Sequence, residues 1–173
     1  MATVKANPGI ERPFLISPKT IGILACAADA SKNPVITINS GIRSALRQAS
    51  EMYNNLANGK RIAYAAPGRE VVRVYDDNKG LQKAEVVPLM EKKINALSAA
   101  GLRVSLHCVA EAEYQRLNIV DVDRGLPNPR DFVKELVKSA AVTRVITPFT
   151  SVYNSTKVAV DGNEPAIHVE VRQ

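Results

Sequence analysis

Apolar residues recur along the chain with two different periods, and each period predicts its own kind of element. A return every third or fourth position is typical of a helix with one buried face. Helices of this kind are predicted over residues 18–30, 44–58 and 88–99, and from residue 128 onward. Alternating or clustered β-prone residues instead predict strands over residues 35–39, 61–66, 102–107, 118–123, 142–146 and 166–171. The mixture predicts one α+β domain over residues 1–173, with a central, mainly antiparallel sheet and flanking helices.

Proline and glycine residues set the boundaries of several predicted elements. Residues 1–17 contain two prolines and little periodicity, so they are predicted to form an extended N-terminal arm. The β-prone runs Val71–Tyr75 and Lys83–Val87 flank a turn-forming stretch, which predicts a β-hairpin. Pro88 fits the first turn of a helix better than its interior, so a helix is predicted to begin there and to stop at Gly101.

Composition and charge limit the classes of function. With 173 residues, of which 46% are hydrophobic, the chain is long enough for one well-formed core. Its net charge of +6 favours an acidic partner, which could be nucleic acid, an anionic membrane or an anionic cell-wall polymer. Aromatic residues make up only 5% of the chain and tryptophan is absent, so few side chains could stack on the bases of single-stranded nucleic acid. Two cysteines form neither a disulfide framework nor a thiolate cluster, so a metal site would use nitrogen and oxygen ligands.

One short apolar segment, Ile21–Ala28, is a candidate targeting signal. Its apolar core is short and prolines lie just upstream, so a buried helix capped by Ser17 and begun by Pro18 is the preferred interpretation. No apolar run approaches the length that spans a membrane. We therefore expect a protein made in the cytoplasm without its own export signal, and with no membrane partner.

The two histidines of the chain are the main candidates for chemistry. His107 and His168 both occur in short runs that alternate apolar and polar residues, and a strand can aim a polar side chain at one site. Asp121 and Asp123 occur in a further strand-like run. Two imidazoles and one carboxylate would suit a zinc ion with an open coordination position. Core histidines with satisfied hydrogen bonds, and aspartates at a solvated strand end, are the alternative interpretation.

The order of several short motifs resembles a known family of enzymes. The motifs are Ser40-Gly41-Ile42-Arg43-Ser44, Arg47-Gln48, Met52-Tyr53, Ala66 to Val72, Ser105-Leu106-His107, Val120-Asp121-Val122 and His168 to Val171. In this order they resemble the zinc-dependent D-Ala-D-Ala and L-alanyl-D-glutamate peptidases, whose superfamily includes hedgehog-like folds and many phage endolysins. The resemblance covers about residues 34–171. It implies a hedgehog/DD-peptidase-like fold.

The resemblance also implies a set of zinc ligands. Residues His107, Asp121 and His168 match the ligand positions of the family, with Zn²⁺ as the cofactor. Asp123 lies on the same predicted strand face as Asp121 and is the alternative acidic ligand. Ser105 matches the serine of the family's Ser-x-His motif, which contacts the substrate or orients the site.

Two further residues acquire catalytic roles from the same resemblance. Arg43 is expected to polarise the scissile carbonyl or to bind a substrate carboxylate, since its planar guanidinium suits either. Glu164 is expected to act as the general base, and Glu170, which shares a strand face with His168, is the alternative.

The resemblance implies a phage-type hydrolase, a metallopeptidase that cleaves the peptide stems of peptidoglycan. Such an enzyme would reach the cell wall after release through a separate pore, or as a component of a bacteriophage virion with virion partners. The alternative is a virion or assembly protein that keeps the peptidase fold without catalysis, which the long separation of His107 from Asp121 favours. A basic nucleic-acid-binding domain has only the charge in its favour.

Overall fold

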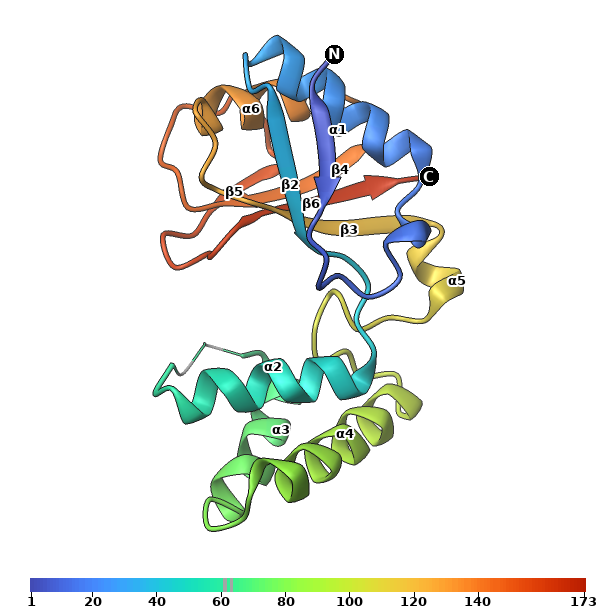
Figure 1. Cartoon of the computed structure of the whole chain (residues 1–173), viewed down its shortest axis with the longest axis vertical. Coiled ribbons are helices and arrows are strands. Elements are labelled where there is room, and N and C mark those ends of the chain that lie inside the picture. Colours follow the sequence, from blue (N-terminus) through green and yellow to red (C-terminus); the bar gives the residue numbers. More distant parts are fainter. Residues whose placement is uncertain (61, 63) are drawn as a thin grey trace. The chain divides into compact units, whose positions relative to one another are not determined.

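The computed structural model describes residues 1–60, 62 and 64–173 and shows an α+β chain, as predicted (Figure 1). These residues form two compact units, each with its own hydrophobic core. The first unit, which contains the sheet, comprises Met1–Ile42 and Ala110–Gln173. The second, the helical unit, comprises Arg43–Val109. The single domain predicted over residues 1–173 thus contains two such units.

The sheet unit is built on a mixed sheet of six strands. In spatial order the strands are β1 (Thr3–Ala6), β2 (Val35–Ser40), β3 (Leu117–Val122), β6 (Ile167–Arg172), β4 (Val142–Thr147) and β5 (Val158–Val160). The three central pairings are antiparallel, whereas both edge pairings, β1 with β2 and β4 with β5, are parallel. The antiparallel part therefore lies at the centre, where β3 and β6 pair over their full length.

Helices cover one face of this sheet. Helices α1 (Pro18–Ala30) and α6 (Pro129–Leu136) pack side by side on it (Figure 1). Alternate residues of the central strands face these helices, so that Val120 of β3 and Val169 of β6 are fully buried with Phe132 of α6. The intervening residues of β3 and β6 face the other way. One face of the sheet thus holds this core, and the opposite face carries polar residues, among them Asp121, His168 and Glu170, beside apolar ones such as Ile119.

The ends of the sheet unit combine predicted and unpredicted features. Helix α1 begins as predicted, because the Ser17 side chain accepts a hydrogen bond from the Thr20 amide and Pro18 occupies the first turn. Within the predicted N-terminal arm, β1 pairs with β2 and a short 3-10 helix spans Pro13–Leu15. Strand β5 and the short helix α5 (Glu111–Tyr114) were not predicted.

The described residues of the helical unit form three helices around a small core. They are α2 (Ala45–Ala57), α3 (Ala66–Asp77) and α4 (Lys83–Ala99). Met52 of α2, Val71 of α3 and Met90 of α4 are completely buried against one another's helices. Helix α2 agrees with the prediction, and its N-terminus is capped by the Ser44 side chain, which accepts from the Arg47 amide.

The β-hairpin predicted over residues 71–87 is wrong, because both of its arms are helical. Gly68 and Val71 are buried one turn apart on α3, and the apolar residues of the first arm continue that helical face. Gln82 and Glu85 form a capping box that starts α4 at Lys83, ahead of Pro88. Pro88, predicted to begin a helix, therefore lies inside one.

Of two other predicted strands, the one over residues 102–107 is wrong, and the one over residues 61–66 lies partly outside the described residues. No strand forms over residues 102–107, because local hydrogen bonds turn the chain there: the Cys108 amide donates to the Ser105 carbonyl and the His107 amide to the Ser105 hydroxyl. The strand predicted over residues 61–66 includes residues 61 and 63, which lie outside the described residues. Its last residue, Ala66, begins α3.

None of the helices in the described part of the chain combines the length and the apolar character that crossing a lipid bilayer requires.

Candidate metal centre

The candidate site lies on the sheet face opposite the core. Strands β3 and β6 pair so that Asp121 is directly opposite His168, and paired residues project from the same face. Oδ1 of Asp121 lies 3.1 Å from Nδ1 of His168. The two side chains are only 14% and 5% exposed. The central pairing of the sheet thus holds a carboxylate and an imidazole together in a largely dry environment.

A bulge in strand β2 brings one of its residues next to Asp121. Ile38 pairs with Val122, whereas Ser40 pairs with Asp121, so one extra residue is accommodated in β2. Such a bulge turns a side chain from one face of a sheet to the other. Ser40 is buried beside Asp121 as a result.

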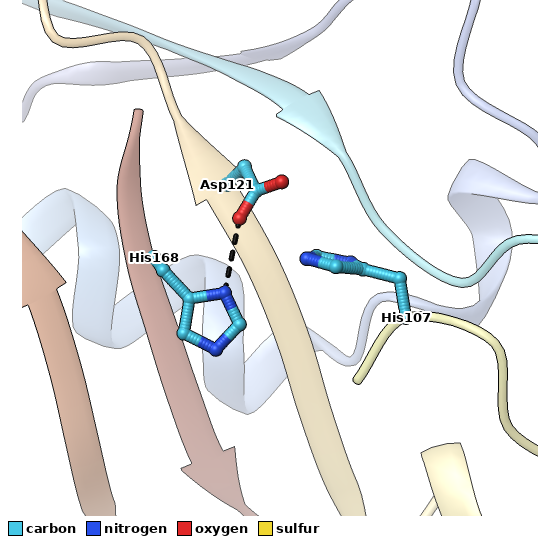
Figure 2. Close-up of side chains that lie close together, drawn as sticks. All are labelled: His107, Asp121 and His168. Carbon is cyan, nitrogen blue, oxygen red and sulfur yellow. Dashed lines mark hydrogen bonds and ion pairs between the residues drawn. The ribbon is translucent and has the colours of Figure 1, made fainter. Parts of the chain in front are cut away.

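His107 adds a second imidazole. It is 6% exposed and lies in the irregular segment between α4 and α5. Its carbonyl accepts a hydrogen bond of 2.9 Å from the Arg43 amide, and its own amide donates to the Ser105 hydroxyl at 3.3 Å. His107, Asp121 and His168 each offer one ligand atom, and these atoms all lie within 4.8 Å of one another (Figure 2). The three residues form a cluster that could bind a metal ion.

The donor set of this cluster fits a divalent transition metal. Imidazole nitrogen and carboxylate oxygen are common ligands of such ions, and ligand atoms bonded at about 2.1 Å in a tetrahedron lie roughly 3.4 Å apart. The 3.1 Å between Asp121 and His168 is already close to that separation. The ligand atoms of the whole cluster lie within 4.8 Å of one another.

His168 is strongly affected by its neighbours. Burial is the largest single influence on the pKa of His168 and lowers it, but the hydrogen bonds and negative charges of Asp121 and Glu170 together outweigh burial and raise the pKa to about 9. In the metal-free protein at neutral pH, the ring therefore carries a proton on both nitrogens. A metal ion that binds this ring must displace one of those protons.

Glu170 and Arg144 extend the polar row on this face. Oε1 of Glu170 lies 3.4 Å from Nε2 of His168, on the nitrogen that does not contact Asp121. Nη1 of Arg144, on β4, lies 3.7 Å from the same carboxylate oxygen. Arg144 was not singled out in the sequence. Its only signal was a charged position in a predicted strand, because the pairing of that strand with β6 could not be known.

The remaining predicted residues take different positions. Asp123 follows β3, and its Oδ1 accepts a 2.7 Å hydrogen bond from the Gly125 amide in a turn, outside the cluster. Glu164 is half-buried in the loop that leads into β6, where its amide donates to the Asp161 carbonyl. Arg43 precedes α2, and its Nη1 lies 3.4 Å from Oε1 of Gln48.

Tyr114 is a neighbour of the site that the sequence did not indicate. It is fully buried, and its hydroxyl donates a 3.1 Å hydrogen bond to the Ile119 carbonyl of β3. Burial raises the pKa of its hydroxyl, and the charge of Asp121 adds to the increase. Tyr114 thus stays neutral and ties α5 to the strand that carries Asp121.

No family model matches the chain, and neither a curated protein nor a solved structure matches it. What the chain offers toward a function is therefore its own side chains: two buried imidazoles and a carboxylate, with a second carboxylate beside one imidazole.

Proposed function

We propose that this protein is a zinc-dependent peptidase that hydrolyses peptide bonds in the stem peptides of peptidoglycan. The observation that carries the proposal is the cluster of His107, Asp121 and His168. Catalytic zinc sites characteristically use three protein ligands and leave one position for water, whereas structural sites close with four. The cluster has three residues and no thiolate, which suits the catalytic type.

The residues of the chain would divide the work of hydrolysis. His107, Asp121 and His168 would hold the ion. Zinc bound there would acidify a coordinated water molecule and polarise the scissile carbonyl. Glu164, half-buried before β6, would accept a proton and return it to the leaving amine.

Arg43 would bind a carboxylate of the substrate. The Arg43 amide donates a hydrogen bond to the His107 carbonyl. This bond keeps the residue before α2 beside one of the proposed zinc ligands. A planar guanidinium can bind a carboxylate through two parallel hydrogen bonds. Ser105 would position His107 through the hydrogen bond between its hydroxyl and the His107 amide.

The charge of the chain supports the same class of substrate. Peptidoglycan stems carry free carboxylates, and cell walls contain anionic polymers, so a net charge of +6 favours encounter with the wall. The motif order that resembles phage lytic peptidases supports action on the wall after release, or from a virion. The hedgehog/DD-peptidase-like fold is part of this proposal.

The test combines metal analysis with assay of purified peptidoglycan. We expect one zinc ion per chain and the release of new amino termini. Asp121→Asn should lose both zinc and cleavage, because the amide is a much weaker ligand than the carboxylate. Asp123→Asn is the matched control and should keep both. Glu164→Gln should keep zinc and lose cleavage, which would separate proton transfer from metal binding.

A protein without zinc and without cleavage would contradict the proposal. It would favour the second candidate, a non-catalytic virion or assembly protein that retains the peptidase fold. The specific observation in favour of that candidate is the length of chain from His107 to Asp121, which exceeds the family spacing and contains helix α5.

A further inference from the structure

A row of charged side chains runs across the site face from β6 to β4. His168 and Glu170 are two positions apart on β6, so both project from the same face. Arg144 of β4 pairs directly with Glu170. This pairing depends on a bulge, because Val142 pairs with Val171 and the extra residue, Thr143, donates its hydroxyl to the Glu170 carbonyl. The backbone thus fixes where the Glu170 side chain lies.

The imidazole of His168 is held between two carboxylates through its two nitrogens. Nδ1 lies 3.1 Å from Asp121, and Nε2 lies 3.4 Å from Glu170. Figure 2 shows Nδ1 turned toward Asp121 and the other ring nitrogen turned away from it. The side chain of Glu170 is 12% exposed, so little water competes for its oxygens.

We propose that Glu170 is a positioning residue, which accepts a hydrogen bond from Nε2–H of His168 and thereby keeps Nδ1 as the metal-binding nitrogen. The inference rests on the proposed metal site. A histidine that binds a metal through one nitrogen commonly donates the N–H of the other to a carboxylate, which fixes the tautomer and the ring orientation. Asp121, the other proposed ligand, is on the Nδ1 side, and Glu170 is on the opposite side.

Arg144 completes the arrangement by neutralising Glu170. Its guanidinium lies 3.7 Å from Oε1, the same oxygen that faces His168. The ion pair helps to hold the Glu170 carboxylate in place beside the His168 ring. Because Glu170 is engaged with the ring edge remote from Asp121, it is a hydrogen-bond partner of the ligand and not the proton acceptor of the reaction, a role left to Glu164.

The first measurement is zinc affinity in a competition titration with a chromophoric chelator. Glu170→Ala removes the acceptor, and we expect zinc affinity to fall by about 10- to 100-fold, the usual effect of losing such a partner. Glu170→Gln keeps an acceptor oxygen in the same place and should retain affinity within a few-fold. Glu135→Ala, which removes a carboxylate of α6 and its ion pair with Lys138, is the control and should bind zinc like the unaltered protein.

The second measurement identifies the metal-binding nitrogen directly. Long-range ¹H–¹⁵N correlation spectra of the zinc-loaded protein should show His168 protonated at Nε2 and coordinated through Nδ1. This spectrum needs no variant, so it decides the matter even if Glu170→Ala does not fold. Coordination through Nε2, or a Glu170→Ala protein that binds zinc as tightly as the original, would overturn the inference.

The outcomes separate this inference from the proposed function. Zinc bound through Nδ1 without any cleavage of peptidoglycan would support the inference and defeat the proposed peptidase. Cleavage with zinc bound through Nε2 would do the opposite. A protein that binds no zinc would defeat both.

Discussion

Asp121 and His168 face each other because two neighbouring strands pair in register, not because they are close in sequence. Each side chain alone would be costly to bury as an ion, and the pair offsets much of that cost by hydrogen bonding. Glu170 places a second negative charge on the same ring. In the metal-free protein the two carboxylates therefore favour the protonated, positively charged ring. In the metal-bound protein the positive charge of the ion would balance the carboxylates instead.

The stability of the metal-free protein should consequently depend on pH through His168. Its pKa is about 9 in the folded protein, above the ordinary value of 6.5, so the folded state holds the proton more tightly. The stabilisation is fully present below about pH 6.5 and is lost as the pH rises through 9; the two pKa values correspond to something on the order of 3 kcal/mol. Denaturant unfolding with a chelator present, at pH 6.5 and pH 9.5, measures the loss.

His168→Gln is the reference for this measurement, because glutamine can still form hydrogen bonds but does not titrate. The difference in unfolding free energy between the two proteins should shrink as the pH rises through 9. A difference that stays constant over this range would show that the ring gains no proton affinity on folding.

At the residue scale, the sequence indicated which side chains belong to the candidate site, but not which side chains contact one another there. With only two histidines in the chain, any imidazole-based metal site using two such ligands had to include both His107 and His168. Alternation on a strand also put Glu170 on the face of His168. The partners of each ring nitrogen could not be predicted, because they depend on the register of β3, β6 and β4, which no local pattern encodes.

At the scale of elements, helix α4 contains an internal defect. Pro88 is in its second turn, where it has no amide hydrogen to donate to the carbonyl one turn earlier and where its ring crowds that carbonyl. The capping box of Gln82 and Glu85 and the buried face around Met90 stabilise the helix despite this residue. The Pro88 side chain itself is exposed, so it contributes no core packing.

Pro88→Ala should therefore stabilise the helical unit. Restoring the hydrogen bond and relieving the crowding is expected to raise the unfolding free energy by about 1 to 3 kcal/mol, since proline inside a helix costs about 3 kcal/mol or more. Circular dichroism during thermal unfolding would measure it. Asn95→Ala, an exposed change in the same helix, should raise stability by only a few tenths of a kcal/mol. Equal effects of the two changes would mean that Pro88 is not strained.

The wrong hairpin has a physical explanation in the same segment. Val71 to Tyr75 contains three valines and a tyrosine, which favour strands when considered locally. The segment is nevertheless helical, because a helix buries one face of α3 against α4. This tertiary packing outweighs the local preference of valine and tyrosine for strands. The starts of α1, α2 and α6 carry local sequence signals, a capping serine or a proline in the first turn, and these three helices were predicted correctly.

At the scale of the whole molecule, the sheet unit is assembled from two stretches that are far apart in sequence. Strands β1 and β2 come from the first stretch, and the other four strands come from the second. The chain between them, residues 43–109, forms a helical unit with its own core. Composition and periodicity predicted the α+β class but not this division, because no proline-rich or glycine-rich linker marks its limits.

Two separate cores predict two separate units of local unfolding. Met90→Ala opens a cavity in the helical core and Phe132→Ala opens one in the sheet core, where both side chains are fully buried. Each truncation should cost about 2 to 5 kcal/mol. Because the core residues of the two units do not overlap, the loss should be confined to the unit that carries the change.

Hydrogen exchange followed by mass spectrometry, on metal-free protein, measures where the protection is lost. Met90→Ala should accelerate exchange within residues 43–109, and Phe132→Ala should accelerate it within residues 1–42 and 110–173. Each variant serves as the control for the other, since both remove a large apolar side chain from a filled core. Faster exchange along the entire chain in both variants would mean that the two cores unfold together, as a single cooperative domain.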